Sequence, residues 1–269
     1  MPFLVESHHN RGRRAATLSA SRQFNRQSAL RTMTSTELFN LLDRSAWFRA
    51  APDALRAQLI ELGRTRGLPA GQRLFNRGDA DDGFYCVLDG LMRIGSITAS
   101  GREALLAVIE PVNWFGEIAL FDGQTRTHDA YAERDTLLFH VPRAALTALL
   151  ERTPAFWHAF GLLLTHKLRL AFDAIEEAAL LPAAQRVARR LLLMAGGYRG
   201  GAGALRRVLK VPQEDLAMML ALSRQTTNQI LRQFETQGAL ALRYAEIEIV
   251  DAQKLRAFAV STNDDAERA

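Results

Sequence analysis

The stretch PQEDLAMMLALSRQTTNQILRQFETQGALALRYAEIEIV, residues 212–250, decides the C-terminal fold. It holds two helical patterns that are separated only by Ala221 and Leu222. Pro212 suits the first turn of a helix. Ser223 is a natural N-cap, because its hydroxyl accepts a hydrogen bond from an amide two or three residues further on. The pattern therefore predicts two helices joined by a tight turn.

The apolar residues of these helices, expected over 212–220 and 223–237, recur at helical spacing. They form one inward-facing set, which is Leu216, Met219, Leu220, Leu222, Ile230, Leu231 and Phe234. Ala217 is small, which lets the two helices cross closely. Strand patterns over 240–242 and 246–250, separated by a turn, then predict a hairpin after the second helix. The whole stretch predicts a winged helix-turn-helix.

The turn between the helices departs from the usual pattern of such units. Ala221 stands at the position that glycine usually holds. If the backbone there requires a positive φ, the cost for a residue with a Cβ is on the order of 1 kcal/mol. A positive φ at Ala221 would therefore make this turn strained.

The second helix carries side chains suited to reading DNA. Arginine can donate to guanine O6 and N7, and glutamine or asparagine can pair with adenine N6 and N7. The base-reading candidates on its first turns are Arg224, Gln225, Asn228 and Gln229. Phosphate contacts position a helix without reading sequence, and the candidates are Gln213, Thr226, Thr227 and Arg232, with the N-cap Ser223 beside them. A pair of solvated amphipathic helices is the alternative, but the hairpin and the N-cap favour DNA binding.

Charge is distributed unevenly along the 269 residues, which carry a net +5. Residues 1–34 hold six Arg and one Glu, residues 35–182 have a net charge of −4, and residues 183–269 have +4. The C-terminal segment, and not the overall pI, therefore supports a nucleic-acid role. The composition of 1–34 predicts a disordered extension; a transit peptide, a basic arm that touches DNA and an upstream addition to a chain starting at Met33 are the alternatives. Residues 261–269 are expected to form a disordered tail.

Short strand patterns follow two N-terminal helices expected over 36–42 and 52–62. The expected strands are 74–75, 84–88, 91–97, 105–109, 130–132 and 136–141. Asp89-Gly90 is expected to close a hairpin between the second and third of them. Many short strands with turns about every eight to twelve residues predict a compact antiparallel barrel or roll.

A long helix is expected from Pro154 onward. Its apolar residues alternate at spacings of four and three, as in a coiled-coil seam, and they are Trp157, Gly161, Leu164, Leu168, Ala171, Ile175 and Ala178. A helix lying on its own barrel is the alternative, but the length of the run favours a partner helix. We expect a parallel homodimer through helix 154–180, with a hinge at Pro182. A further helix over 185–194 and a glycine-rich connector over 196–203 should follow.

Over residues 35–258 the chain resembles the CRP/FNR family of regulators. The residues that carry the resemblance are Phe115-Gly116-Glu117-Ile118-Ala119-Leu120, Arg126-Thr127, Leu216-Ala217 and Ser223-Arg224-Gln225-Thr226. The resemblance implies an α+β fold class, with an N-terminal antiparallel β-roll of the cyclic-nucleotide-binding type, a long dimerisation helix and a C-terminal winged helix-turn-helix. The implied domains are 35–152 for the effector, 153–182 for the dimerisation helix and hinge, and 183–260 for DNA binding.

The resemblance also implies a phosphate-binding cassette between Phe115 and Thr127. Gly116 lets the backbone approach a ligand closely, and the Glu117 carboxylate can accept a hydrogen bond from a ribose hydroxyl. The amides around Ile118 and Ala119 can face a phosphate. This half of the cassette therefore suits the sugar and phosphate of a nucleotide.

Arg126 and Thr127 complete the cassette. Arg126 can bind a phosphate through two donors, and Thr127 offers a hydroxyl to the same group. The structural alternative is an internal ion pair between Glu117 and Arg126. Family members that bind no nucleotide typically lack one of these two residues, so the presence of both favours a cyclic nucleotide. No cofactor is expected, and cAMP or another cyclic nucleotide is the expected effector.

The other wall of the expected pocket departs from the family pattern. In cAMP receptors the long helix supplies hydroxyl groups to the base, but the matching residues here are Ala171 and Phe172. Lys167 stands where an arginine is often found, and Phe172 could stack on a purine. His128 and Asp129 also replace small residues. The base end therefore leaves open another nucleotide or a degenerate pocket.

Other chemistry finds little support in the sequence. Cys86 is the single cysteine, which excludes a cysteine-ligated iron–sulfur sensor and fits a reducing compartment. Haem ligation by His140 or His158 is a weak alternative. We expect a cytoplasmic regulator, not an enzyme, that binds double-stranded DNA at a pseudo-palindromic operator, acts with RNA polymerase and has no membrane segment. A ligand-independent DNA binder and a barrel-type enzyme with a helical accessory domain are the second and third hypotheses.

Overall fold

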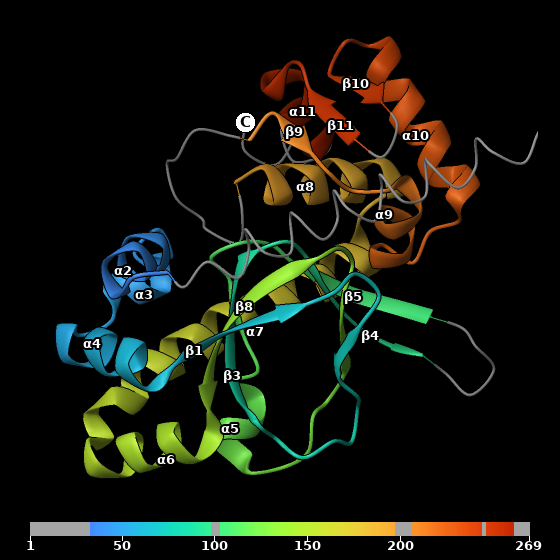
Figure 1. Cartoon of the computed structure of the whole chain (residues 1–269). Coiled ribbons are helices and arrows are strands. Elements are labelled where there is room, and N and C mark those ends of the chain that lie inside the picture. The colour runs from blue at the N-terminus through green and yellow to red at the C-terminus, as the bar shows by residue number, and fades with distance from the viewer. Residues whose placement is uncertain (1–32, 98–102, 197–205, 244–245, 261–269) are drawn as a thin grey trace, which may run out of the picture.

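The computed structural model describes residues 33–97, 103–196, 206–243 and 246–260 (Figure 1). The predictions made for 1–32, for 261–269 and for most of the glycine-rich connector fall outside these residues. Helices cover one end of a central β-roll, and the C-terminal helices and strands lie at its other end (Figure 1).

Two four-stranded antiparallel sheets form the β-roll and confirm the predicted fold class. One sheet has the strand order β1 (Arg64–Leu68), β8 (Thr136–Pro142), β3 (Gly83–Asp89) and β6 (Trp114–Phe115). The other has the order β2 (Arg73–Phe75), β7 (Asp129–Ala132), β4 (Met92–Ile97) and β5 (Glu103–Ile109). Strand β1 was not predicted, because its sequence Arg-Thr-Arg-Gly-Leu is mostly exposed and has no apolar alternation.

The prediction of a hairpin at Asp89-Gly90 is wrong. Strand β3 pairs with β8 and β6, whereas β4 pairs with β5 and β7. Gly90 does turn the chain, with a φ of 97°, but the turn carries it from one sheet to the other. A Cβ at Gly90 would lie 2.4 Å from the hydroxyl oxygen of Thr136. Close packing and backbone conformation therefore both require glycine here.

Four helices cover one end of the roll, and they are α2 (Ser35–Leu42), α3 (Ala46–Ala50), α4 (Asp53–Leu62) and α6 (Arg143–Arg152). Thr34 and Glu37 form a capping box at the start of α2. The predicted disordered extension therefore ends before Thr34, because Thr34 caps helix α2. Helix α3 was not predicted, since five residues are too few to show a helical period.

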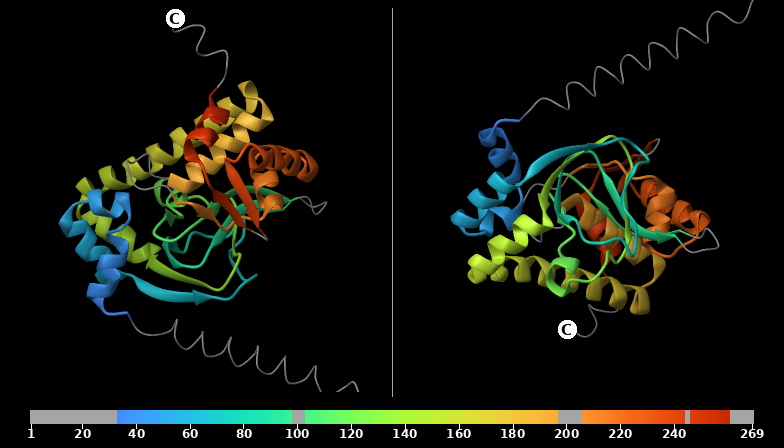
Figure 2. Two further views of the ribbon diagram at one scale, coloured as in Figure 1. Left: turned by 90° about the horizontal axis from the view of Figure 1, so that it is seen from above. Right: turned by 60° about the horizontal axis from the view of Figure 1, so that its bottom comes forward.

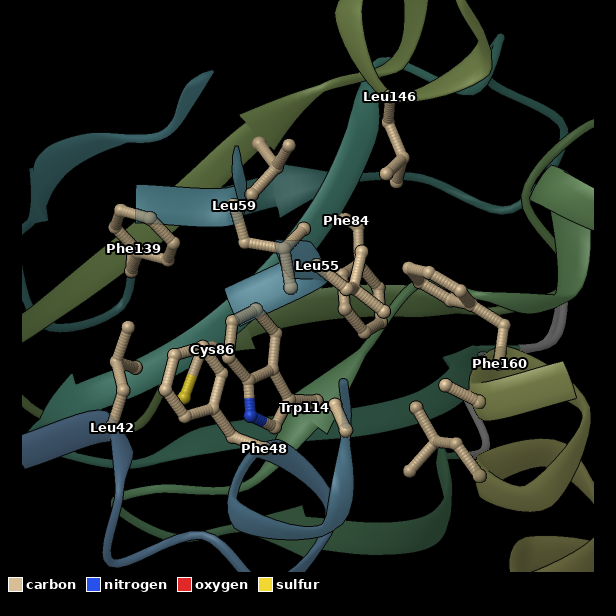
Figure 3. Close-up of a cluster of buried hydrophobic side chains, with 14 of the residues drawn as sticks. Leu42, Phe48, Leu55, Leu59, Phe84, Cys86, Trp114, Phe139, Leu146 and Phe160 are labelled. Atoms are coloured by element: carbon tan, nitrogen blue, oxygen red, sulfur yellow. The ribbon is translucent and has the colours of Figure 1, made fainter. Parts of the chain in front are cut away.

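Aromatic side chains fill the core between these helices and the roll (Figure 3). The Trp114 ring stacks on Phe84 at 4.9 Å and on Phe48 at 5.9 Å between centroids. Trp47 packs edge-on against Trp114 and Phe160. Because Phe160 belongs to the long helix α7, this cluster fixes the start of α7 to the roll.

Cys86 lies inside the same cluster and is fully buried (Figure 3). Burial raises the pKa of its thiol well above the ordinary value. The thiol therefore stays protonated at neutral pH and packs as a small apolar side chain.

Helix α7 (Trp157–Leu180) follows a short 3-10 turn over Pro154–Phe156 and runs along one side of the roll (Figure 2). Its first half is buried on the roll through Ala159, Phe160 and Leu163. Its second half leaves large apolar side chains exposed, namely Leu168, Phe172, Ile175 and Leu180. The first half thus lies on its own barrel, whereas the second half presents an uncovered apolar face.

The C-terminal elements form the predicted winged helix-turn-helix. In order they are α8 (Ala183–Gly196), β9 (Val208–Leu209), α9 (Gln213–Met219), α10 (Arg224–Thr236), β10 (Leu240–Arg243), β11 (Glu246–Ile249) and α11 (Ala252–Ala259). The antiparallel pairing of β10 with β11 confirms the hairpin, to which β9 adds a third strand. Strand β9 and helix α11 were not predicted.

The turn between α9 and α10 meets the condition for strain that the sequence analysis gave. Ala221 adopts a φ of 51°. Pro212 precedes α9 as its N-cap instead of occupying the first helical turn, because its ψ of 142° is extended. Leu216, Leu220, Ile230, Leu231 and Phe234 are buried as expected, and Met219 and Leu222 are partly buried.

Replacing Ala221 with glycine is expected to raise the free energy of unfolding by about 0.5–1 kcal/mol. Glycine removes the left-handed strain, and this gain outweighs the greater backbone freedom of glycine in the unfolded chain. Ala221 is exposed, so little packing is lost. Urea unfolding of the two proteins measures the difference, and a less stable variant would contradict the assignment of strain.

Candidate functional site

The cassette begins where β6 ends in the roll. Gly116 follows this strand with a φ of 95°, and Glu117 precedes the short helix α5 (Ile118–Asp122). A Cβ at Gly116 would lie 2.9 Å from a guanidinium nitrogen of Arg126 and 3.0 Å from the Gly83 carbonyl oxygen. Only glycine therefore allows the chain to pass this close to the arginine.

Arg126 is buried and its guanidinium group is surrounded by acceptors. It donates to the carbonyl oxygens of Gly116 at 3.0 Å and Gly83 at 2.6 Å. One nitrogen also pairs with Asp81 at 2.8 Å and with Asp82 at 2.6 Å. The group lies 4.3 Å from the centroid of the Phe75 ring. The phosphate-binding candidate thus already carries two carboxylate partners from its own chain.

Asp82 differs from Asp81 in exposure, and this difference decides which carboxylate can move. The Asp81 side chain is 1% exposed and also pairs with Arg143, whereas the Asp82 side chain is 44% exposed. Burial opposes ionisation of Asp82, but hydrogen bonds from Tyr85 and Arg126 outweigh it and hold the pKa of Asp82 below its ordinary value. Asp82 is therefore a charged, accessible competitor for Arg126.

Glu117 is held by the long helix. Its buried carboxylate accepts a hydrogen bond from Lys167 Nζ at 2.7 Å, and the same ammonium group donates to the Trp114 carbonyl oxygen at 2.8 Å. The alternative of an internal pair between Glu117 and Arg126 is not what the structure shows, since each has another partner. Lys167 therefore links the cassette to α7.

A cavity of about 1500 Å³ connects the cassette with α7. The predicted effector residues at its wall are Gly116, Glu117, Ile118, Ala119, Arg126, Thr127 and Lys167. Thr127 is exposed, and its hydroxyl lies 2.9 Å from His128 Nδ1. Burial, followed by the charge of Arg77, lowers the pKa of His128, which favours the neutral imidazole.

The two residues that replace the family's hydroxyl groups at the base end of the pocket lie in different places. Ala171 lines the cavity. Phe172 is 59% exposed and does not belong to the cavity wall, so the structure does not bring it to the other effector candidates. Its ring belongs to the uncovered face of α7, of which Leu168 and Ile175 do line the cavity.

Sequence reasoning missed the acidic partners of Arg126. Asp81 and Asp82 lie in the loop that precedes β3, where two adjacent carboxylates are typical of a solvated segment. The same segment contributes Tyr85, which donates a short hydrogen bond to Asp82. The sequence feature that could have indicated these partners is the pair of aspartates next to Gly83. In the structure Gly83 has a φ of 144°, and its carbonyl oxygen accepts a hydrogen bond from the buried Arg126.

The recognition helix begins as predicted. Ser223 caps α10 by accepting a hydrogen bond from the Thr226 amide at 2.9 Å. The side chains of Arg224, Gln225 and Gln229 are exposed on its first turns. These three are therefore free to approach base edges.

Three further candidates are linked by hydrogen bonds, and a fourth is buried. Asn228 donates to Gln213 at 2.6 Å and accepts from Arg232 Nε at 2.9 Å. This arrangement links α9 to α10 through the base-reading and phosphate-contacting candidates. The expectation that Thr227 contacts phosphate is wrong, because its side chain faces the core and is 0% exposed.

Comparison with known proteins identifies both halves of the chain. Residues 65–153 match the cyclic nucleotide-binding domain, and residues 185–258 match the Crp-like helix-turn-helix domain. The chain is 30% identical over 191 residues to the cyclic AMP receptor protein of Thermus thermophilus, covering 71% of this chain and 86% of that protein. The chain belongs to the CRP/FNR family of transcription regulators.

Other CRP/FNR proteins agree with this assignment. The CRP-like cAMP-activated global transcriptional regulator of Mycobacterium tuberculosis is 28% identical over 218 residues, which cover 80% of this chain and 96% of that protein. A CRP/FNR-family regulator from Thermus thermophilus aligns with a TM-score of 0.59 and 26% identity, over 74% of this chain and 99% of the other. FixK2 from Bradyrhizobium japonicum has the same fold, with a TM-score of 0.65, 21% identity and coverage of 74% and 98%.

This CRP/FNR chain is thus a DNA-binding transcription regulator with a cyclic-nucleotide-binding domain, and the family is not one of enzymes. Among the described residues, no helix is long and apolar enough to cross a membrane. The described part of the chain also lacks any group of three or more His, Cys, Asp or Glu side chains that could hold a metal ion.

Proposed function

We propose that this regulator is a homodimer that binds a cyclic nucleotide in the β-roll and a pseudo-palindromic operator through its recognition helices. The observation that carries the proposal is the convergence of Glu117, Arg126 and Lys167 on one cavity. Glu117 and Arg126 are buried and paired within the chain, but Asp82, one partner of Arg126, is accessible enough to give way to a phosphate. In this proposal the cassette and the long helix form one effector site.

The nucleotide phosphate would replace Asp82 on Arg126. Asp82 is accessible and can turn toward solvent, whereas Asp81 is enclosed and would keep its contact. The ribose hydroxyl would meet Glu117, whose partner Lys167 lies on α7. Occupation of the site therefore changes contacts at the long helix as well as in the roll.

The second half of α7 is the proposed dimer interface, within the helix predicted over 154–180. Leu168 and Ile175, members of the predicted seam, are 51% and 65% exposed, and Phe172 is 59% exposed beside them. Large apolar side chains at this spacing suit a second copy of the helix. In such a dimer the Phe172 ring would approach the base end of the partner's cavity.

The DNA part of the proposal places α10 in the major groove. Arg224, Gln225 and Gln229 would read base edges, whereas Gln213, Ser223, Thr226 and Arg232 would position the helix on phosphates. Asn228 reads bases only after release from Gln213. We also propose the domain division at about residues 152 and 182, and RNA polymerase as a partner on promoter DNA.

A ligand-independent regulator is the second candidate function. The observation that favours it is that Arg126 and Glu117 already have partners in the chain. In that case the roll would serve only as a scaffold, and the cavity would bind no nucleotide.

Calorimetry with cAMP and with cGMP separates these two functions. We expect micromolar binding of at least one nucleotide to the wild type, and a loss of about tenfold to a hundredfold in Glu117→Gln and Arg126→Lys. Arg143→Gln is the matched control, because it also removes a contact to Asp81 but lies outside the cavity wall. Absence of binding to the wild type would reject the nucleotide and leave the second candidate.

Replacing Arg224 with alanine is expected to weaken binding to the operator by about 1–3 kcal/mol and to leave binding to random DNA nearly unchanged. The reason is that a side chain that reads a base contributes only at the correct sequence. Fluorescence anisotropy with both duplexes measures the two losses. Equal losses on operator and random DNA would show that Arg224 contacts phosphate instead.

A further inference from the structure

Helix α9 of the helix-turn-helix lies against the outer face of the β-roll, beside β5 (Figure 1). Leu91, Leu105 and Val108 of the roll form a separate apolar cluster there with Met218 and Met219 of α9. This contact is small, so apolar burial alone gives it limited strength. Its polar contacts therefore matter.

A buried ion pair crosses this contact. Arg93 of β4 lies 2.9 Å from Asp215 of α9, and the two side chains are 9% and 5% exposed. Arg93 also pairs with Glu133 at 3.1 Å and lies over the Tyr131 ring. A charge that is removed from water destabilises the folded state unless an opposite charge pairs with it. Loss of either charge therefore favours separation of α9 from the roll, which returns the remaining charge to solvent.

A second ion pair joins the same two parts of the chain. Arg206 donates to both carboxylate oxygens of Glu110, at 2.8 and 2.7 Å. Glu110 directly follows β5, and Arg206 precedes β9. The helix-turn-helix is thus held at two points of the β4–β5 pair.

The effector cavity reaches β4 and β5 from inside the roll and extends to Leu105, which belongs to the apolar cluster with α9. Ile94 and Ala107, which pair across the two strands, point into the roll and line the cavity. Met219 reaches the same cavity from α9. A shift of β4 or β5 caused by a ligand would therefore act directly on the surface that holds α9.

The docked arrangement is unfavourable for DNA binding on electrostatic grounds. In a helix-turn-helix the first helix crosses the DNA backbone, but here α9 packs on β5, and residues 35–182, which include the roll, carry a net charge of −4. Docking also pairs Arg206 with Glu110, which neutralises one cation of the C-terminal segment. Both effects lower the attraction for DNA.

We propose that Arg93 and Asp215 form a latch that holds the helix-turn-helix on the β-roll in a conformation of low DNA affinity, and that a ligand in the cavity releases it. The proposal rests on the proposed function for its ligand. The latch itself is independent of which ligand binds.

Hydrogen–deuterium exchange of the full chain tests the latch without DNA or nucleotide. We expect amide protection in α9 and β5 to fall about tenfold in Arg93→Gln and in Asp215→Asn. Arg56→Gln is the matched control, because it removes a partly buried ion pair with Asp43 that does not join the two parts. Unchanged protection in both variants, with circular dichroism as in the wild type, would overturn the latch.

DNA affinity is measured with the duplex that the wild type enriches from a random pool. Without nucleotide, both variants are expected to bind it at least about tenfold more tightly. Tighter binding by Arg93→Gln is the decisive result, because the loss of a positive charge would by itself weaken DNA binding. Glu214→Gln controls for the charge removed from α9, because Glu214 is the exposed neighbour of Asp215.

Weaker or equal DNA binding by Arg93→Gln would show that the docked arrangement is not the inhibited one. Should either variant fold poorly, Arg206→Gln breaks an exposed contact and is expected to act in the same direction by about twofold to fivefold. If the wild type binds neither cAMP nor cGMP, the proposed effector fails. The nucleotide-free comparisons still decide whether the latch exists.

Discussion

Replacing Arg126 with alanine is expected to lower the free energy of unfolding by about 3–5 kcal/mol. The guanidinium group is 3% exposed and is the buried partner of Asp81, whose side chain is 1% exposed. Without it, the Asp81 carboxylate stays enclosed with Arg143 as its other cation, and the carbonyl oxygens of Gly83 and Gly116 lose a donor. A change made at the ligand site therefore disrupts the fold of the roll.

Urea denaturation followed by circular dichroism measures this loss. Arg143→Ala serves as the control, because it removes the other cation of Asp81 but its side chain is 34% exposed. The control should lose no more than about 1 kcal/mol. A loss below 1 kcal/mol in Arg126→Ala would mean that Asp81 reaches water or becomes protonated at little cost.

Replacing Ile175 with glutamate is expected to weaken dimerisation at least about a hundredfold. In the proposed dimer, the two carboxylates would be buried on the seam between the α7 helices without cationic partners, and each copy would add its own cost. The isolated chain should remain folded, because Ile175 is 65% exposed in it. Sedimentation velocity over a range of concentrations measures the shift.

The matched control for dimerisation is Val250→Glu. Val250 is also a large apolar residue, 55% exposed, but it lies at the end of the wing and not on α7. Sedimentation of this variant should match the wild type. An Ile175→Glu protein that remains a dimer at the same concentrations would place the interface elsewhere.

Local chemistry explains why the DNA-binding part was predictable from sequence. Ser223 caps its helix through a hydrogen bond to a residue three positions away, and the turn at Ala221 spans only a few residues. Helix faces repeat with a short period, so the inward set from Leu216 to Phe234 is visible in the sequence. No distant part of the chain has to be known for these features.

Strand pairing and the acidic partners of the arginine depend on distant parts of the chain. Gly90 adopts a left-handed conformation whether it closes a hairpin or passes between sheets, so the local sequence does not distinguish the two. The partner of β3 is β8, about fifty residues away. Asp81 and Asp82 look like loop residues until folding brings Arg126 to them.

The buried position of Cys86 makes this protein convenient for site-specific spectroscopy. The native thiol is the only one in the sequence and is fully enclosed, and burial raises its pKa, so probes that require a thiolate should leave it unmodified. A cysteine introduced at an exposed position of α10 would then be the single reactive one. Fluorophores or spin labels could report distances between recognition helices without first removing the native residue.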